Sequence, residues 1–145
     1  MLHFDGRGHT GAIVTLGGNH IFSYSSKQKI QARSSTEAEL IALDDITTYV
    51  VWMRQLMVDL GIEMEDNPTI IYQDNKSGVE ILEGGGNFRR TKHMVGRYAY
   101  VKENLDRKII RLEYRNTKKM TANMHTKPVN RDELEMHCKS FNLFL

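Results

Sequence analysis

The sequence predicts an α/β fold in which a mixed β-sheet is flanked by helices. Two short β-type runs lie near the N-terminus, a long stretch of helical periodicity follows them, and two further β-type runs alternate with helical segments. This order of elements is typical of layered α/β proteins. A chain of 145 residues has the length of one domain with one hydrophobic core, so we expect a single domain over residues 1–145.

The composition is that of an ordinary soluble globular protein, with 40% hydrophobic and 26% charged residues. Lys and Arg number 20 against 18 Asp and Glu, so only a local charge cluster could indicate a nucleic-acid partner. The single cysteine, Cys138, cannot form an internal disulfide. No apolar run approaches the roughly 20 residues of a membrane span. We therefore expect an intracellular protein of the cytoplasm or nucleus, with no membrane partner.

The N-terminal third predicts a β-hairpin. Residues 9–16 and 21–25 have strand composition, and the glycine-rich segment 17–19 between them has turn chemistry. Residues 30–33 are a candidate third short strand.

A long helix is predicted over residues 36–60, and Gly61 is a natural residue to end it. Thr36 and Glu39 have the spacing of a capping box, in which each side chain satisfies a free backbone N–H at the helix start. In the alternative interpretation, Glu39 is an inward-facing carboxylate available to a metal. A second acid would then be needed, and Asp74 is the candidate.

Residues 69–72 form a short, apolar, β-branched run that predicts a buried strand, followed by a short helix over 77–82. Asp74 comes directly after the strand. Acidic residues at the carboxyl ends of such strands often bind ligands or metals. The alternative is that Asp74 only opens the next turn.

The densest positive cluster comprises Arg89, Arg90, Lys92 and His93. Such clusters are often solvated surface, but this one opens a predicted helix, where positive charge opposes the helix dipole. A phosphate backbone would offset that penalty, so nucleic-acid binding is the alternative function of the cluster.

The C-terminal third predicts one strand and two helices. Residues 110–115 alternate between apolar and polar side chains, as in a strand with one buried face. A short helix is expected over 118–124. A last helix over 131–141 lies within a helical tail that comprises residues 129–145.

Six short motifs then occur in a distinctive order between residues 9 and 128: Ser-Lys-Gln-Lys, Ser-Ser-Thr-Glu-Ala-Glu-Leu, Tyr-Gln-Asp-Asn, Arg-Thr-Lys-His, Arg-Leu-Glu-Tyr and Thr-Lys-Pro. Each motif alone is weak. Together they resemble the ribonuclease H domain at the end of copia-type retrotransposon polyproteins.

The resemblance implies a five-stranded mixed sheet surrounded by helices, and an enzyme that cuts the RNA strand of an RNA–DNA hybrid. The family uses acids on the first strand, the first long helix, the central strand and the last helix to hold two divalent ions, Mg²⁺ or Mn²⁺. By motif, the helix acid is Glu39 and the central-strand acid is Asp74, and both are expected to be metal ligands. Glu37 points away from Glu39 on the helix and is expected to be a surface or capping acid.

The family's first acid lies on a strand upstream of His-Thr-Gly, which here begins at His9 after only eight residues. One alignment makes Asp5 a loop residue and residues 1–8 a remnant, so that the first strand is missing or incomplete. The other makes Asp5 the catalytic acid of a shortened first strand. Both alignments remain open.

Asn123 is the second departure, because it stands where the resemblance implies an aspartate. An amide offers an oxygen but no negative charge, so metal binding is expected to be weakened, above all for a second ion. We therefore expect a degenerate ribonuclease H, weak or inactive, with nucleic acid and the remainder of a retrotransposon polyprotein as partners. The alternatives are a non-catalytic remnant that binds nucleic acid, or a protein-interaction piece that uses an exposed sheet edge.

Overall fold

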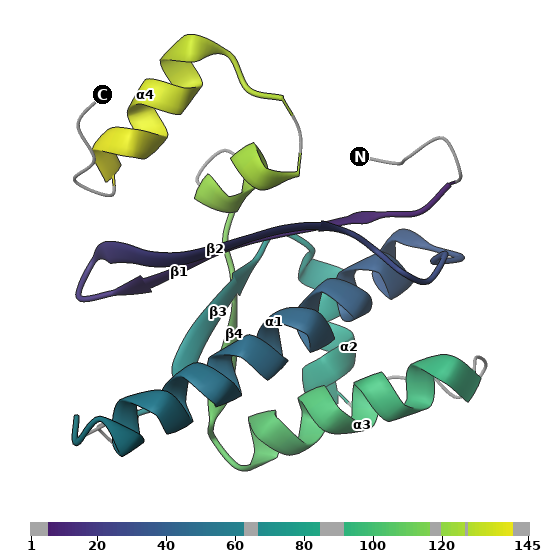
Figure 1. Cartoon of the computed structure of the whole chain (residues 1–145). Coiled ribbons are helices and arrows are strands. Elements are labelled where there is room, and N and C mark those ends of the chain that lie inside the picture. Colours follow the sequence, from purple (N-terminus) through teal and green to yellow (C-terminus); the bar gives the residue numbers. More distant parts are fainter. Residues whose placement is uncertain (1–5, 63–66, 85–91, 117–119, 127, 141–145) are drawn as a thin grey trace. The chain divides into compact units, whose positions relative to one another are not determined.

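The computed structural model describes residues 6–62, 67–84, 92–116, 120–126 and 128–140, which form a mixed α/β structure (Figure 1). The chain divides into two compact units. The hairpin unit comprises residues 1–32 and 117–145, and the helical unit comprises residues 33–116. Among the described helices, none combines the length and the apolar character that crossing a bilayer requires.

The predicted hairpin is confirmed. Strands β1 (His9–Leu16) and β2 (Asn19–Lys27) pair antiparallel through a two-residue turn. Gly17 and Gly18 in that turn have φ values of +58° and +82°. Left-handed conformations at both positions match the right-handed twist of the flanking strands, and glycine adopts them without strain.

The predicted third strand at residues 30–33 is wrong, because β2 is followed by irregular structure up to the start of the next helix. Gln28 closes the hairpin instead. Its backbone N–H donates to Gly8 O at 2.9 Å, and its buried side chain donates from Nε2 to Thr10 Oγ1 at 3.2 Å. A further strand needs a paired neighbour, and the described chain offers none beyond this point.

The short helix expected over residues 118–124 is a 3₁₀-helix, η3 (Thr121–His125), in the part of the chain that the structure describes. It packs against β1 at Gly11. A Cβ atom at Gly11 would lie 2.5 Å from Thr126 Cγ2 and 3.0 Å from the backbone carbonyl carbon of His125. Only glycine therefore allows this close approach.

The last predicted helix is confirmed as α4 (Arg131–Ser140). Asn130 precedes it and accepts a hydrogen bond at Oδ1 from the backbone N–H of Glu133 at 2.8 Å, which caps the helix start. His137 and Cys138 are its buried residues.

The helical unit is built around the long predicted helix, α1 (Ser35–Asp59). Its buried residues lie in its first two thirds, where Leu40, Leu43 and Val50 are each 4% exposed or less. The end of α1 has a different character, since Trp52 is 57% and Leu60 67% exposed.

Gly61 ends α1 as predicted, with a φ of +76°. The N–H of Gly61 donates to Val58 O and that of Ile62 donates to Met57 O, both at 2.9 Å. This pair of bonds is the Schellman motif, which satisfies the last carbonyl groups of a helix.

The other two strands, β3 (Thr69–Gln73) and β4 (Ile110–Tyr114), pair in parallel. The expected alternation of β4 is confirmed, because Ile110 and Leu112 are buried between exposed or half-buried residues. The prediction that β3 is a buried strand holds only in part, since Gln73 is buried but Ile70 is 37% exposed. Side chains alternate between the faces of a strand, and the buried Gln73 lies on the face of the half-buried Thr69 and Ile71.

The predicted α/β class is confirmed, whereas one mixed sheet is not seen among the described strands. They form two separate two-stranded sheets, one antiparallel and one parallel. A mixed sheet would need a strand hydrogen-bonded to both pairs, and no described strand occupies that position.

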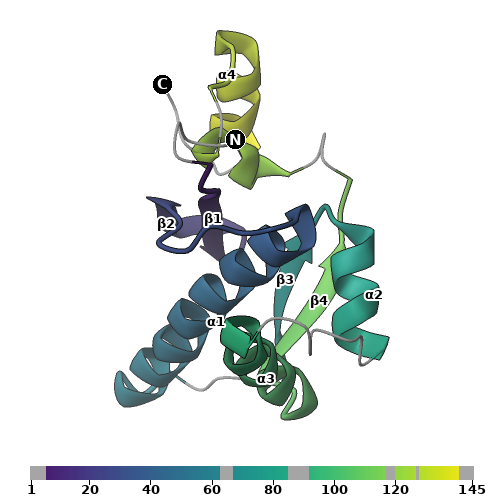
Figure 2. The ribbon, with the colours of Figure 1, turned by 90° about the vertical axis from the view of Figure 1, so that its right-hand side faces the viewer.

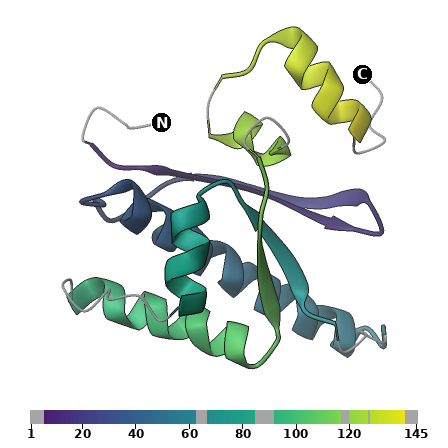
Figure 3. The same ribbon diagram turned by 180° about the vertical axis from the view of Figure 1, so that it is seen from behind.

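Helices α2 (Lys76–Gly84) and α3 (Lys92–Asp106) pack against β4, and α3 also packs against α1 (Figures 2 and 3). An ion pair joins α1 to α3. The guanidinium of Arg97 donates to Asp44 Oδ2 and lies 3.5 Å from Asp45 Oδ1, and all three side chains are less than a third exposed. The helical unit therefore has its own core and a partly buried polar link between two of its helices.

Candidate functional site

The start of α1 is capped by residues other than those predicted. Ser34 is the N-cap, and its Oγ accepts a hydrogen bond from the backbone N–H of Glu37 at 3.2 Å. Glu37 in turn accepts the backbone N–H of Arg33 at 2.7 Å through Oε2. The predicted Thr36–Glu39 capping box is therefore wrong, because the cap lies two residues earlier.

This cap assigns a role to Glu37, which was expected to be a surface or capping acid. The carboxylate caps the helix, and the residue is only 9% exposed, so the surface alternative is wrong. Since Ser34 and Glu37 serve the helix start, Glu39 is not needed there.

Glu39 and Asp74 are neighbours in the helical unit, although they come from different elements. Burial raises the pKa of the half-buried Glu39 carboxyl above its ordinary value, and the negative charge of Asp74 raises this pKa further. A charge acts on a carboxyl in this way only when the two groups are close. The second turn of α1 and the end of β3 therefore place two carboxyl groups within reach of each other's charge.

Asp74 is located as the sequence predicts, directly after β3 and two residues before α2 begins. The backbone carbonyl of the next residue, Asn75, accepts the N–H of Val79 at 3.3 Å, so the chain enters α2 at once. Both interpretations of Asp74 thus describe its position: it follows a strand, and it opens the turn into a helix.

The chemistry of this donor set limits what it can bind. Two carboxylates are enough for one hydrated Mg²⁺ ion, which binds proteins through one or two carboxylates and keeps several waters. They are too few to neutralise two such ions. No group of three or more His, Cys, Asp or Glu side chains that could hold a metal occurs among the described residues.

The other predicted acid positions lie elsewhere in the chain. Asp5 lies outside the described residues. Asn123 lies on η3 in the hairpin unit, where its backbone carbonyl accepts both the N–H and the Oγ1 hydroxyl of Thr126 at 3.0 Å. The helical unit by itself therefore provides the Glu39–Asp74 pair and no third predicted acid.

The predicted basic cluster is described only in part. Arg89 and Arg90 lie outside the described residues, whereas Lys92 and His93 form the first backbone positions of α3. The expectation that the cluster opens a helix is confirmed for these two residues.

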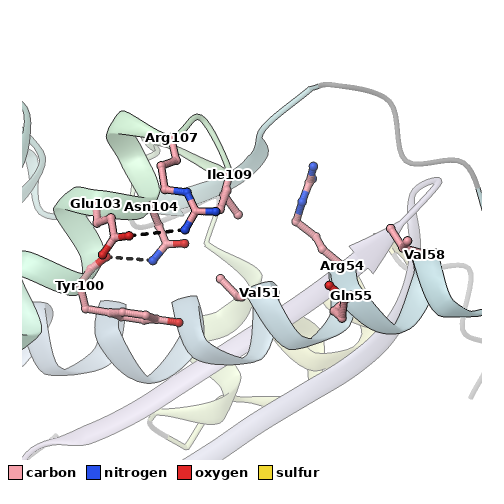
Figure 4. Close-up of a pocket in the computed structure, with 9 residues that line it drawn as sticks. All are labelled: Val51, Arg54, Gln55, Val58, Tyr100, Glu103, Asn104, Arg107 and Ile109. Carbon is pink, nitrogen blue, oxygen red and sulfur yellow. Dashed lines mark hydrogen bonds and ion pairs between the residues drawn. The ribbon is translucent and has the colours of Figure 1, made fainter.

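A cavity of about 350 Å³, which the sequence did not indicate, lies between α1 and α3 (Figure 4). Its arginines are already engaged: Arg54 donates to Asn67 O and Thr69 Oγ1 at 3.1 Å, and Arg107 pairs with Glu103 at 3.4 Å. Neither Glu39 nor Asp74 lines this cavity. Its lining residues are Val51, Arg54, Gln55, Val58, Tyr100, Glu103, Asn104, Arg107 and Ile109.

Comparison with known proteins identifies relatives over most of the chain. It is 31% identical over 130 residues to the retrovirus-related Pol polyprotein from transposon TNT 1-94 of Nicotiana tabacum, a match covering 90% of this chain and 10% of the polyprotein. The Pol polyproteins from transposons RE2 and RE1 of Arabidopsis thaliana are each 31% identical over 121 residues, which is 83% of this chain and 8% of theirs.

The chain thus spans about a tenth of the length of the curated relatives it matches. No protein-family model and no solved structure matches it. Over most of its length, this chain is homologous to one segment of retrovirus-related Pol polyproteins from transposons.

Proposed function

We propose that this chain is the ribonuclease H-like segment of a copia-type Pol polyprotein, with RNA–DNA hybrid as its substrate and a weakened metal site. The observation that carries this proposal is the Glu39–Asp74 pair. The two residues occur in the two motifs that correspond to the family's helix and central-strand acids, and their carboxyls interact across the helical unit.

The pair would hold one Mg²⁺ or Mn²⁺ ion, with Asp74 and Glu39 as its protein ligands. Bound there, such an ion supplies a Lewis acid that activates water and stabilises the leaving oxygen. The contribution of the chain itself is to hold two negative charges close together. Burial first, and the negative charge of Asp74 second, raise the pKa of Glu39, so a bound cation would favour the charged form of its carboxyl.

A direct test is cleavage of a labelled RNA–DNA hybrid by the purified chain in Mg²⁺ and in Mn²⁺. Any metal-dependent cleavage should be abolished by Glu39→Gln and by Asp74→Asn. Glu80→Gln is the matched control, because Glu80 is exposed on α2 and its ion-pair partner among the described residues is the exposed Lys76. Cleavage that survives both site substitutions would rule out the pair as the metal site.

The second candidate function is a non-catalytic nucleic-acid-binding segment, which the amide at position 123 and the two-carboxylate donor set favour. The same assay separates the two functions. Hybrid binding without any metal-dependent cleavage above the Glu39→Gln background would support the binding function and exclude the enzyme.

A further inference from the structure

A cation stacks on an aromatic ring at the carboxyl end of the β3–β4 pair. The guanidinium carbon of Arg115 lies 3.4 Å from the centre of the Tyr72 ring. The backbone N–H of Arg115 also donates to Gln73 O at 2.7 Å, so the ladder between the strands continues one residue beyond β4. Both the backbone and the side chain of Arg115 are therefore held in place.

The register of the two strands puts Arg115 beside Asp74. The last Cα partners are Tyr72 with Glu113 and Gln73 with Tyr114, so Asp74 and Arg115 are the first residues after the paired positions of β3 and β4. The bond from the Arg115 N–H to Gln73 O holds Arg115 at this end of the pair, where Asp74 directly follows Gln73. The stack on Tyr72 keeps the guanidinium at this end too.

Arg115 also differs from most described cations of the helical unit in its ion pairing. Among the residues that the structure describes, no carboxylate forms an ion pair with it. By contrast, ion pairs engage Lys76, Arg97, Lys102, Arg107 and Arg111. A guanidinium stacked on a ring keeps its N–H edge available, and that edge matches two oxygens of a phosphate group.

We propose that Arg115, held by its stack on Tyr72, anchors a backbone phosphate of a nucleic-acid strand next to the Glu39–Asp74 pair. This inference rests on the proposed nucleic-acid substrate. The strand would pass the carboxyl end of the β3–β4 pair with one phosphate at Arg115 and the neighbouring phosphodiester at the carboxylates. Arg115 is in this respect a positioning residue.

The test is binding of a fluorescently labelled RNA–DNA hybrid to the full chain in Mg²⁺ at several salt concentrations, with the hybrid checked for integrity afterwards. Arg115→Gln should weaken binding at low salt by roughly tenfold and reduce the slope of log affinity against log salt by about one. Arg115→Lys should keep the salt slope but lose part of the affinity, because it retains the charge without the planar fork. Tyr72→Leu should likewise weaken binding without changing the number of charges.

Lys108→Gln is the matched control. Like Arg115, Lys108 has no ion pair among the described residues, but it is exposed, precedes β4 and so lies at the opposite end of the strand. This variant should bind like the unmodified chain. Thermal unfolding followed by circular dichroism establishes that each variant is folded.

The inference is overturned if the unmodified chain does not bind the hybrid at low salt, or if Arg115→Gln binds as Lys108→Gln does. These failures are separate from failure of the proposed reaction. Binding that depends on Arg115 without metal-dependent cleavage would refute the proposed reaction and support the phosphate anchor. Cleavage that depends on Glu39 but not on Arg115 would support the proposed reaction and refute the phosphate anchor.

Discussion

Glu39 is half-buried beside a second carboxylate, and burial and the neighbouring charge both raise its pKa. Its pKa in the folded chain is thus higher than in the unfolded chain, so the folded state binds more protons between the two values. The contribution of Glu39 to stability is then fully present below the unfolded pKa and is lost as the pH rises through the folded pKa. At neutral pH, the charged side chain destabilises the fold.

Replacing Glu39 with glutamine should therefore raise the melting temperature near neutral pH, because the amide has no charge to desolvate or repel. The gain should shrink as the pH falls toward the ordinary glutamate pKa of 4.5. Circular dichroism melts across this pH range measure the effect, with Glu80→Gln as an exposed control. A loss of stability at neutral pH would mean that the Glu39 carboxylate makes a net stabilising contact.

The motifs single out the two residues of the proposed site, Glu39 and Asp74, but they do not indicate Arg115. Glu39 and Asp74 stand in recognisable local sequences. Arg115 comes next to Asp74 only through the register of two strands that are far apart in the chain, and its stack on Tyr72 has no local signature. A sequence pattern reports which face a residue occupies, but not which distant residue faces it.

At the scale of the element, α1 illustrates how a helix can be predicted correctly while its first residue is not. Three consecutive hydroxyl residues, Ser34, Ser35 and Thr36, each have the chemistry of a cap. The pattern of two glutamates offers both Ser34–Glu37 and Thr36–Glu39 as capping pairs. The structure uses the earlier pair, which leaves Glu39 inside the helix.

Two alanine substitutions test this assignment. Ser34→Ala should lower the free energy of unfolding by about 1 kcal/mol, because the backbone N–H of Glu37 loses its acceptor. Thr36→Ala should change it by less than about 0.5 kcal/mol, the usual range for a site without such a contact. Urea denaturation measures both. A larger loss of stability in Thr36→Ala than in Ser34→Ala would instead support the Thr36–Glu39 capping box, with Glu39 as a capping residue.

The ion pair of Arg97 with Asp44 and Asp45 links α1 to α3. Arg97→Ala removes the cation that faces both Asp44 and Asp45, and it leaves two partly buried carboxylates adjacent. Burial raises the pKa of Asp44, and the negative charge of Asp45 raises it further, whereas Arg97 lowers it. Loss of Arg97 should therefore raise the pKa of Asp44.

The expected loss for Arg97→Ala is about 1–3 kcal/mol in the free energy of unfolding near neutral pH. The loss should become smaller in acid, where the carboxylates are protonated. Arg107→Ala is the matched control on the same helix, because its partner Glu103 is exposed and such pairs contribute about 0.2–1 kcal/mol. Equal losses in urea denaturation would show that the partly buried Arg97 pair contributes no more than an exposed one.

At the scale of the whole molecule, sequence reasoning predicted the order of elements better than their assembly. The hairpin, the long helix, the parallel-type strand and the last helix lie where periodicity and turn residues place them. The division into two separate sheets was not predicted, because strand pairing depends on contacts between distant segments rather than on local pattern.

The activity of the whole chain is expected to be undetectable or very slow in Mg²⁺, with partial recovery in Mn²⁺. The reason is that two carboxylates cannot neutralise two divalent ions, and removing parts of a catalytic unit usually lowers the rate by orders of magnitude. Asn123→Asp alone should add little activity if the first-strand acid is absent. Gel analysis of a labelled hybrid measures these rates.

Fast cleavage by the unmodified chain that is lost in Asp5→Ala would contradict this expectation. It would establish that Asp5 is the catalytic acid of a shortened first strand, as the second alignment holds. Phe4→Ala is a suitable neighbouring control, because it alters the same segment without removing a carboxylate.

The exposed end of α1 gives the protein an unusual spectroscopic property. The chain has a single tryptophan, Trp52, and this side chain is already 57% exposed in the folded state. Its indole emission should therefore resemble that of a hydrated fluorophore before and after unfolding, and a denaturant titration followed by tryptophan fluorescence should have little amplitude. A ligand or polypeptide that covers this end of α1 would exclude water from the indole and shift its emission to shorter wavelength. Trp52 is thus a built-in reporter of surface contact at one place on the molecule, and steady-state emission spectra with and without a bound hybrid would reveal whether the nucleic acid reaches it.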